Sequence, residues 1–325
     1  MPVEQQALRR KREKHRTEMR DFQQLQWDAT LEDDCRQLVR LATREDLDRW
    51  HDWTSMALVP VDARSSAAIV ARQAGWICGL RAAQLALTTM DYQATWQGNV
   101  EDGAAVEGGT VLATIEGAAR TLLVAERTIL NFVGRLSGVS TIAAAYVAAV
   151  AGTRARIYDT RKTTPGWRRL EKYAVRCGGG HNHRTGLFDA ILIKDNHLAL
   201  GRQAGGGQFT PAEAVRRARD FCAEGKGGEP RSDLIVEIEV DSLAQLDEVL
   251  PARPDIVLLD NMSLDALAHA VRRRDALGVP VELEASGGVN LTTVRGIAET
   301  GVDRISVGAL THSAIALDVG LDWLS

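Results

Sequence analysis

Four cationic side chains and three histidines gather in one short stretch near the middle of the chain. The cations are Arg161, Lys162, Arg184 and Lys194, and each follows an apolar run or a glycine turn such as Gly178-Gly179-Gly180. Arginine offers a planar fork for a carboxylate or phosphate, and lysine offers a compact point charge. Cations at such fixed positions indicate an enzyme that binds a small, strongly anionic pair of substrates.

The elements that must position these side chains alternate regularly after Gly152. Six short apolar runs have the composition of strands: Ala155–Asp159, Ala190–Lys194, Leu234–Val240, Ile256–Asp260, Val281–Ala285 and Arg304–Val307. Helical patterns lie between them, at Trp167–Arg176, Pro211–Ala223, Leu243–Val249, Leu264–Leu277 and Thr292–Thr300. This alternation predicts a parallel sheet, and near-continuous apolar strands favour its closure into a barrel. Six strands are fewer than the eight of a complete barrel, so we expect an incomplete, six-stranded parallel α/β barrel.

Functional groups of such barrels gather at the carboxyl ends of the strands. The first two runs end in cations, the third and fourth end in the carboxylates Glu239 and Asp260, and the last two end in small residues. Glu239 and Asp260 could bind ribose hydroxyls, hold Mg²⁺ or stabilise positive charge that develops on a sugar. The alternative is a structural ion network with Lys162 or Lys194. Glu237 shares a strand face with Glu239, and we prefer Glu239 because it lies nearer the end of the strand.

Small residues follow the last two predicted strands. Ser286-Gly287-Gly288 and Val307-Gly308-Ala309 each precede a helical stretch, where backbone N–H groups and the helix dipole favour a phosphate. The alternative is that these turns simply need glycine. His312, four residues after Gly308, either caps that phosphate site or packs. His183, beside Arg184 after a glycine turn, is either a site residue or a histidine satisfied by its surroundings.

The composition is that of an ordinary globular protein with room for two domains. The chain has 325 residues, a formal net charge of −4, 45% hydrophobic and 25% charged residues. The acidic balance argues against a nucleic-acid binder. Four widely separated cysteines argue against disulfides or structural zinc and favour a reducing cytoplasm. No apolar run predicts a signal peptide or a membrane span.

The N-terminal half has a different organisation. We expect a helix over Asp33–Leu47, strands at Ala67–Ala71 and Val111–Ile115, and two helices within Thr121–Ala151 that meet near Ser137-Gly138. The domains expected are a basic extension over residues 1–27, an α+β sandwich with linking helices over 28–151, the barrel over 152–310, and a segment over 311–325 that returns to the N-terminal domain. Residues up to Arg20 are expected to form a solvated helix, with an RNA- or membrane-binding arm as the alternative.

The chain resembles the quinolinate phosphoribosyltransferase family, the decarboxylating nicotinate-nucleotide pyrophosphorylases. The resemblance covers most of the chain from about Ala63 onward, in the family's order. The segments that carry it are Glu126–Asn131, Asp159–Pro165, Lys172–Arg176, Gly178–Asp189, Leu192–His197, Leu258–Asn261, Glu284–Gly288 and Val307–Ser313. The resemblance implies an N-terminal α/β sandwich followed by an incomplete α/β barrel, in agreement with the pattern of elements.

The resemblance also implies a reaction and its residues. Quinolinate and 5-phosphoribosyl-1-pyrophosphate would give nicotinate mononucleotide, pyrophosphate and CO₂, with Mg²⁺, in NAD biosynthesis. Lys162, Glu239 and Asp260 would be catalytic, and the two acids would also hold the metal. The substrate-binding set implied is Arg127, Thr160, Arg161, Lys162, His183, Arg184, Lys194, Glu239, Asp260, Ser286, Gly287, Gly288, Gly308 and His312. Arg127 would enter the site of a neighbouring subunit, which implies a homodimer.

Two other functions remain open at this point. One is a relative of the same fold, such as a nicotinate phosphoribosyltransferase or the molybdenum-transport-associated pyrophosphorylase-like protein. A monocarboxylate should need fewer arginines than Arg127, Arg161 and Arg184 provide, so the sequence favours a dicarboxylate. The other is a non-catalytic barrel that binds a phosphorylated metabolite and signals through a partner. The sequence departs from the family in its basic extension, in Asp46–Ser55 and in a glycine-rich insertion near Gly205.

Overall fold

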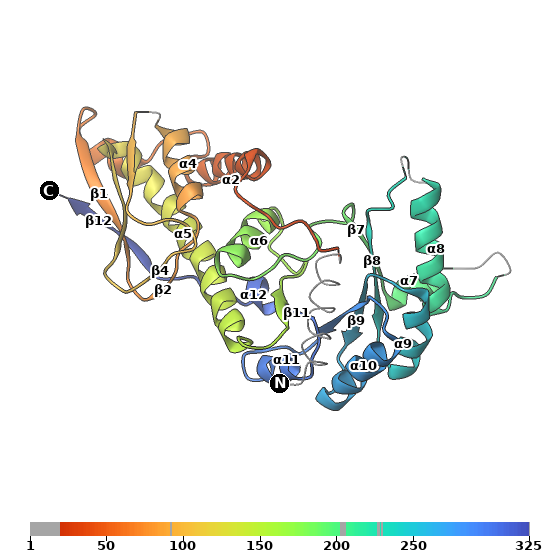
Figure 1. Cartoon of the computed structure of the whole chain (residues 1–325). Coiled ribbons are helices and arrows are strands. Elements are labelled where there is room, and N and C mark those ends of the chain that lie inside the picture. Colours follow the sequence, from red (N-terminus) through yellow and green to blue (C-terminus); the bar gives the residue numbers. More distant parts are fainter. Residues whose placement is uncertain (1–19, 92, 202–205, 226–227, 229, 325) are drawn as a thin grey trace. The chain divides into compact units, whose positions relative to one another are not determined.

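The computed structural model describes the chain except for residues 1–19, 92, 202–205, 226–227, 229 and 325 (Figure 1). The predicted solvated helix before Arg20 and part of the glycine-rich insertion therefore lie outside the described residues. The chain divides into two compact units. The barrel unit contains Ala149–Tyr158, His183–Val307 and the described residues up to Gln23. The antiparallel unit contains Gln24–Ala148, Asp159–Asn182 and Gly308–Ser325.

Six parallel strands form the sheet of the barrel unit, in the order β6-β11-β10-β9-β8-β7. Their bounds are β6 Arg156–Tyr158, β7 Ala190–Ile193, β8 Ile235–Val240, β9 Ile256–Asp260, β10 Glu282–Ser286 and β11 Arg304–Ser306. The predicted fold class is confirmed. Each predicted strand agrees with an observed one to within one residue at either end, because long apolar runs leave few alternative registers.

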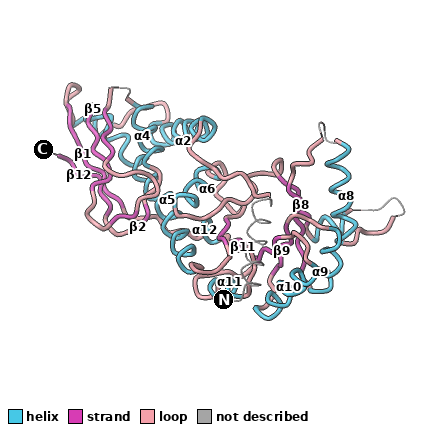
Figure 2. Tube along the Cα trace, in the orientation of Figure 1, coloured by secondary structure: helices cyan, strands magenta, loops and turns pink. Residues whose placement is uncertain are grey.

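Helices connect these strands in the barrel unit, as the alternating colours of Figure 2 show. They are α7 Asp195–Leu200, α8 Pro211–Glu224, α9 Leu243–Val249, the 3₁₀ helix η1 Leu250–Ala252, α10 Leu264–Leu277 and α11 Val294–Glu299. Local caps fix where they begin. The side chain of Thr210 accepts a hydrogen bond from the Glu213 backbone in a capping box, and Ser263 caps α10.

The sheet stays open between its edge strands, β6 and β7, within the described residues. Phe22 is 5% exposed and clusters there with Tyr158 of β6, Ala190 of β7, Ile235 of β8 and Ile256 of β9. Phe22 therefore shares one buried apolar cluster with residues of both edge strands. Part of the predicted basic extension therefore belongs to the core of the barrel unit.

The antiparallel unit is built on a four-stranded sheet in the order β12-β1-β5-β3. The strands are β1 Arg64–Ala71, β3 Thr95–Gly98, β5 Val111–Ala118 and β12 Val319–Leu324, and β2 Gly75–Trp76 pairs separately with β4 Ala105–Val106. The helices are α2 Ala29–Leu47, α3 Trp53–Leu58, α4 Leu80–Met90, α5 Ala119–Ala149, α6 Arg168–Cys177 and α12 Ala309–His312. The C-terminal strand pairs with β1, so the end of the chain is part of this sheet.

The expectation of two helices meeting near Ser137-Gly138 is wrong, because α5 runs unbroken through both residues. Gly138 is needed for close packing rather than for a break: an added Cβ would overlap the carbonyl oxygen of Ile315. The Ser137 hydroxyl accepts a hydrogen bond of 2.9 Å from the N–H of Cys78 and donates one of 3.0 Å to its carbonyl. By length and composition α5 could cross a membrane, but 61% of its most apolar window is buried, as in a core helix.

Candidate functional site

Lys194 and Glu239 form an ion pair where β7 and β8 end. The lysine side chain is 41% exposed and the glutamate side chain 16%, so the pair borders solvent. The backbone N–H of Lys194 donates to Nδ1 of His197 at 2.9 Å, which fixes the turn into α7. The network that the sequence offered as the alternative to a ligand role is therefore present for Lys194. It also orients the lysine, so the two roles are compatible.

Asp260 lies at the end of β9, directly opposite Ser286 of β10. Its Oδ2 accepts a hydrogen bond of 2.9 Å from Nδ2 of Asn261, whose backbone is left-handed with φ of 52°. The Asn261 N–H donates to the carbonyl of Ser286 at 2.9 Å. Gly287 has φ of 93°, and an added Cβ would overlap the Asn261 side chain. Glycine is thus required here by geometry, and a phosphate site at Ser286, Gly287 and Gly288 stays a prediction.

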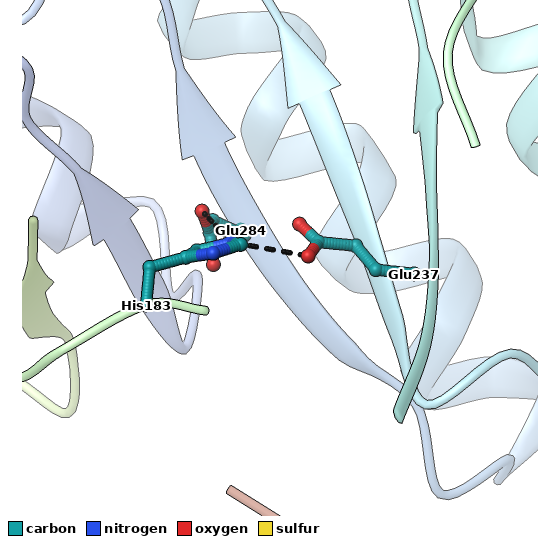
Figure 3. A group of neighbouring side chains, drawn as sticks. All are labelled: His183, Glu237 and Glu284. Carbon is teal, nitrogen blue, oxygen red and sulfur yellow. Dashed lines mark ion pairs between the residues drawn. The ribbon is translucent and has the colours of Figure 1, made fainter. Parts of the chain in front are cut away.

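His183 lies against two acids inside the barrel unit (Figure 3). Its Nε2 is 3.0 Å from a carboxylate oxygen of Glu237 and 3.5 Å from one of Glu284, and both glutamates are completely buried. Its Nδ1 accepts a hydrogen bond of 2.8 Å from the N–H of Arg184. A nitrogen that accepts a hydrogen bond carries no proton, so in neutral His183 the proton sits on Nε2 and faces Glu237.

Burial and charge set the protonation of this group. Burial alone would lower the pKa of His183, but the carboxylates of Glu237 and Glu284 outweigh it and raise that pKa. Burial would raise the pKa of Glu237, but His183 outweighs it and lowers that pKa. For Glu284, burial and the neighbouring Glu237 raise the pKa despite His183 and Arg304. The two acids are therefore driven apart, with Glu237 ionised and Glu284 the better proton holder.

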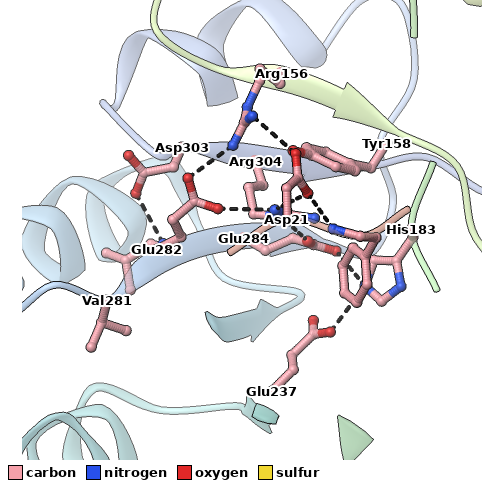
Figure 4. Close-up of polar contacts among 12 residues, drawn as sticks. Asp21, Arg156, Tyr158, His183, Glu237, Val281, Glu282, Glu284, Asp303 and Arg304 are labelled. Carbon is pink, nitrogen blue, oxygen red and sulfur yellow. Dashed lines mark hydrogen bonds and ion pairs between the residues drawn. The ribbon is translucent and has the colours of Figure 1, made fainter. Parts of the chain in front are cut away.

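Arg304 extends the buried group across the barrel interior (Figure 4). The arginine is 0% exposed and contacts Glu284, Glu282 and Asp21 at 2.9, 2.9 and 3.0 Å. Its guanidinium lies 3.6 Å from the ring centroid of Tyr158. A buried cation of this kind is tolerated only with several acids around it. The sequence interpretation missed this network, although charged residues alternating with apolar ones in buried strands, as in Glu282-Leu283-Glu284, were the available signal.

Two sets of acids in the barrel unit have the chemistry of metal ligands. Glu239 and Asp260 offer oxygen atoms at the carboxyl ends of neighbouring strands, which suits Mg²⁺. His183, Glu237 and Glu284 place one nitrogen and two carboxylates within 4.8 Å of one another. That interior set is a poor fit for a metal, because the Arg184 amide leaves the proton on the nitrogen that would have to bind it.

The remaining predicted cations of the central stretch lie in the antiparallel unit. The N–H of Lys162 donates to the Thr160 hydroxyl at 3.0 Å, and its carbonyl accepts from the Thr311 hydroxyl at 2.7 Å. Gly308 lies beside this lysine and His312: a Cβ on the glycine would come within 3.0 Å of Lys162 Cδ and 3.1 Å of His312 Nε2. The structure therefore brings Lys162, Gly308 and His312 together.

A buried ion pair anchors the loop that carries Arg161 and Lys162. The ammonium of Lys172 pairs with Asp159, and both side chains are 0% exposed. Nδ2 of Asn182 donates to the other oxygen of Asp159 at 2.6 Å and to the carbonyl of Lys172 at 2.8 Å. Asp159 and Lys172 were recognised as parts of motifs, but their structural role depends on contacts between segments that no spacing reveals.

Arg127 lines a cavity of about 570 Å³ in the antiparallel unit. The cavity is bounded by α5, the turn before α6 and the segment leading into β12. Its other lining residues are Leu130, Asn131, Gly134, Arg135, Thr164, Trp167, Ala316, Leu317, Asp318 and Val319. Arg135 is held by Glu171 at 2.6 Å and by the carbonyls of Thr311 and Ala314, whereas Arg127 has an exposed side chain. Arg127 is therefore the cation available to a ligand or a second chain.

Comparison with known proteins decides the family. Residues 52–137 match the N-terminal domain of quinolinate phosphoribosyl transferase, and residues 139–322 match its C-terminal domain. The chain belongs to this family. The resemblance inferred from the motifs is confirmed, and with it the assignment to a family of transferases that act on small molecules.

Relatives and solved structures agree across nearly the whole chain. The nicotinate-nucleotide pyrophosphorylase [carboxylating] of Mycobacterium leprae is 45% identical over 294 residues, covering 89% of this chain and 97% of its own. The nicotinate-nucleotide pyrophosphorylase structures from Francisella tularensis and Ehrlichia chaffeensis are 37% and 35% identical, with TM-scores of 0.80 and 0.77. They cover 90% and 89% of this chain, and 97% and 98% of their own. Human nicotinic acid phosphoribosyltransferase, at 16% identity and a TM-score of 0.54, shares the fold alone.

Proposed function

We propose that this protein transfers the phosphoribosyl group of 5-phosphoribosyl-1-pyrophosphate to quinolinate, with loss of CO₂, to give nicotinate mononucleotide. The observation that carries the proposal is the group at the carboxyl ends of β7–β9, in a chain of this family. There Lys194 pairs with Glu239 at the ends of β7 and β8, and Asp260 ends the adjacent strand β9. The two acids suit the positive charge that develops on the sugar, and the lysine suits the anionic acceptor.

The first step is substitution at C1 of the ribose. The C1–O bond to pyrophosphate breaks, the pyrophosphate leaves with the bonding electrons, and the ring nitrogen of quinolinate forms the new C1–N bond. Positive charge develops on the ribose before that bond is complete. The carboxylates of Glu239 and Asp260 stabilise this charge, because they are fixed before the reaction begins.

The second step removes one carboxylate of the acceptor. Its C–C bond breaks to release CO₂, and the electron pair remains on the ring carbon beside the now cationic nitrogen, where it takes up a proton from water. No general base is needed. Arg161, Arg184 and Lys194 neutralise and orient the two carboxylates, with His183 beside Arg184, and Lys162 lies between the two substrates.

The remaining predicted residues are assigned to the phosphate groups and to the metal. Ser286, Gly287, Gly288, Gly308 and His312 would bind the phosphate end, with Thr160 beside Lys162. Mg²⁺ bound by Glu239 and Asp260 would neutralise the pyrophosphate group. The donor set supports this assignment, since both residues offer the oxygen ligands that Mg²⁺ prefers. We propose a cytoplasmic homodimer in which Arg127 enters the partner's site, supported by its exposed position at the cavity of the antiparallel unit.

A turnover assay tests the proposal against the rival of the same fold. The protein is incubated with 5-phosphoribosyl-1-pyrophosphate, Mg²⁺ and either quinolinate or nicotinate, and pyridine nucleotide and CO₂ are measured. We expect nucleotide and CO₂ in equal amounts from quinolinate. Nucleotide from nicotinate alone would instead establish the monocarboxylate enzyme, and binding without turnover of either acid would favour a non-catalytic barrel.

A further inference from the structure

Asp21 and Phe22 lie outside the stretches that match the family, which begin at residue 52. Phe22 nevertheless belongs to the buried apolar cluster of the barrel unit, and Asp21 lies among Arg156, Tyr158 and Arg304 of that unit (Figure 4). A residue whose side chain enters the interior of a fold must satisfy the groups that it meets there. What these two residues contact therefore indicates what this segment does.

Asp21 is held by three groups of the barrel interior. Its carboxylate accepts hydrogen bonds from Arg304 at 3.0 Å, Arg156 at 3.1 Å and the Tyr158 hydroxyl at 2.9 Å. It also accepts from the N–H of Phe22 at 2.8 Å. Four donors from three chain segments fix the position of Asp21. One of them is the backbone N–H of Phe22, so the same contacts also fix where Phe22 begins.

Phe22 lies flat on the imidazole of His183. The two ring centroids are 4.3 Å apart and the ring planes differ by 29°. The guanidinium of Arg304 lies 5.0 Å from the centroid of the Phe22 ring. Stacking at this distance restricts tilting of the imidazole, because the phenyl ring occupies the space on that face.

The orientation of the imidazole matters because both ring nitrogens are engaged. Nε2 faces Glu237 at 3.0 Å, and Nδ1 accepts from the Arg184 N–H at 2.8 Å. Tilting the ring would displace both nitrogens and so alter both contacts together, because the imidazole is rigid. The second contact links the ring directly to the backbone of Arg184.

We propose that Phe22, anchored by Asp21, is a positioning residue for His183 and Arg184. It packs in the buried cluster that includes both edge strands and holds the imidazole in the orientation in which Nδ1 accepts from the Arg184 backbone. The inference rests on the proposed function in one respect only, namely that Arg184 binds the carboxylates of the acceptor. Phe22 itself touches neither substrate.

The test compares Phe22→Leu with Phe22→Tyr in the full-length protein. Leucine keeps most of the apolar volume but loses the flat face, whereas tyrosine keeps the ring. We expect Phe22→Leu to raise KM for quinolinate about three- to tenfold, from the lost stacking, and to leave KM for 5-phosphoribosyl-1-pyrophosphate unchanged. Phe22→Tyr should restore KM for quinolinate toward the wild-type value. Equal KM values for quinolinate in wild type and Phe22→Leu would overturn the inference.

A control separates positioning from simple loss of stability. Leu267, on α10 of the same unit, is 2% exposed and is not part of the buried charged group. Leu267→Ala should lower the melting temperature at least as much as Phe22→Leu without changing KM for quinolinate. If Leu267→Ala raises KM for quinolinate equally, the effect comes from a general loss of stability and the positioning role is wrong.

A measurement without substrate keeps the inference distinct from the proposed reaction. In protein labelled with ¹³C-histidine, the His183 signals are assigned from their loss in His183→Gln. The ring of Phe22 should shift them upfield in the wild type, and Phe22→Leu should abolish that shift. Unshifted wild-type signals would overturn the inference whatever the turnover assay gives. A clear shift in a protein that does not use quinolinate would leave the contact established and remove only the proposed reaction.

Discussion

Glu237 and Glu239 lie two residues apart on the same face of β8, yet their surroundings differ sharply. Glu237 is completely buried and faces His183 inside the barrel unit, whereas Glu239 pairs with a half-exposed Lys194 at the end of the strand. The interior group and this rim therefore share a strand but not an environment. Two residues along a strand span about 7 Å. Over that distance the charge of Glu237 must be neutralised inside the fold, whereas the charge of Glu239 is available to a ligand.

The difference indicates that interior charges and rim charges have separate roles in the barrel unit. Interior charges are balanced by one another: Arg304 meets Asp21, Glu282 and Glu284, and His183 meets Glu237. Substitution there should act first on stability. Rim charges keep contact with solvent, so substitution there should act first on the reaction.

The largest effect is expected from Arg304→Met, which leaves several buried carboxylates without their cation. We expect a loss of about 3–5 kcal/mol in the free energy of unfolding, measured by urea denaturation. The matched control is Arg295→Met, which removes an exposed i,i+4 pair with Glu299 in the same unit and should cost less than about 0.5 kcal/mol. Similar costs for the two variants would contradict the distinction between interior and surface charge.

Asp260→Asn tests the rim in the opposite sense. The amide keeps an oxygen for the Asn261 hydrogen bond but loses the charge that is proposed to stabilise the sugar. We expect kcat/KM for 5-phosphoribosyl-1-pyrophosphate to fall about 100-fold, while the free energy of unfolding changes by less than about 1 kcal/mol. A stability loss as large as that of Arg304→Met would place Asp260 with the structural charges instead.

Glu237→Gln and Glu239→Gln make the comparison sharpest, because the same isosteric change is made twice on one face of β8. Glu237→Gln should lower the free energy of unfolding by about 1–3 kcal/mol, since it weakens the buried contact with His183. Glu239→Gln should lower kcat about tenfold or more and cost less than about 1 kcal/mol in stability. Unfolding and initial rates are measured on both proteins. An exchange of the two outcomes would show that the wrong acid was assigned to the substrate.

Asp21→Asn should have the smallest effect and a characteristic pH dependence. Burial alone would raise the pKa of Asp21, but Arg304 and Arg156 outweigh it and lower that pKa below 3.8. Because the folded pKa is the lower one, the stabilisation is fully present above about pH 4 and is lost as the pH falls through the folded pKa. We expect a difference of about 1–2 kcal/mol from wild type at pH 7 that shrinks toward pH 3.

The control for this prediction is Asp247→Asn, which alters an exposed pair with Arg273 in the same unit. Melting curves from pH 3 to pH 7 should show little difference from wild type for this variant. A difference for Asp21→Asn that is independent of pH would mean that the carboxylate charge is not what stabilises the native state.

Much of the barrel unit could be predicted from local pattern. Apolar runs bounded by glycine or polar residues gave all six strands, and the residues after them gave Lys194, Glu239 and Asp260 as a group at one end of the sheet. The periodicity of apolar residues in strands and helices is a property of neighbouring residues, so it can be recognised in the sequence before the fold is known. The roles of Lys162, Arg161 and His312 remain predictions, as do Mg²⁺ and the dimer.

What failed or was missed depended on contacts between distant segments. Gly138 was interpreted as a helix break, whereas α5 continues and the glycine admits the backbone of Ile315. Phe22 lies in a stretch interpreted as a polar extension, whereas it packs in the buried cluster that includes both edge strands. A glycine in a helical pattern, or one phenylalanine in a polar stretch, has the same local appearance whether or not another segment packs on it.

The sequence by itself determined the alternation of strands and helices, the family motifs and the order in which cations, acids and glycines follow the strands. Those properties are written in neighbouring residues and in their periodicity. Only the tertiary structure decided that Glu237 and Glu284 surround His183, that Arg304 is balanced by three acids, and that Phe22 packs on the imidazole. Burial and pairing are properties of what other segments bring into contact, and charges change their energetic role when water is replaced by those segments.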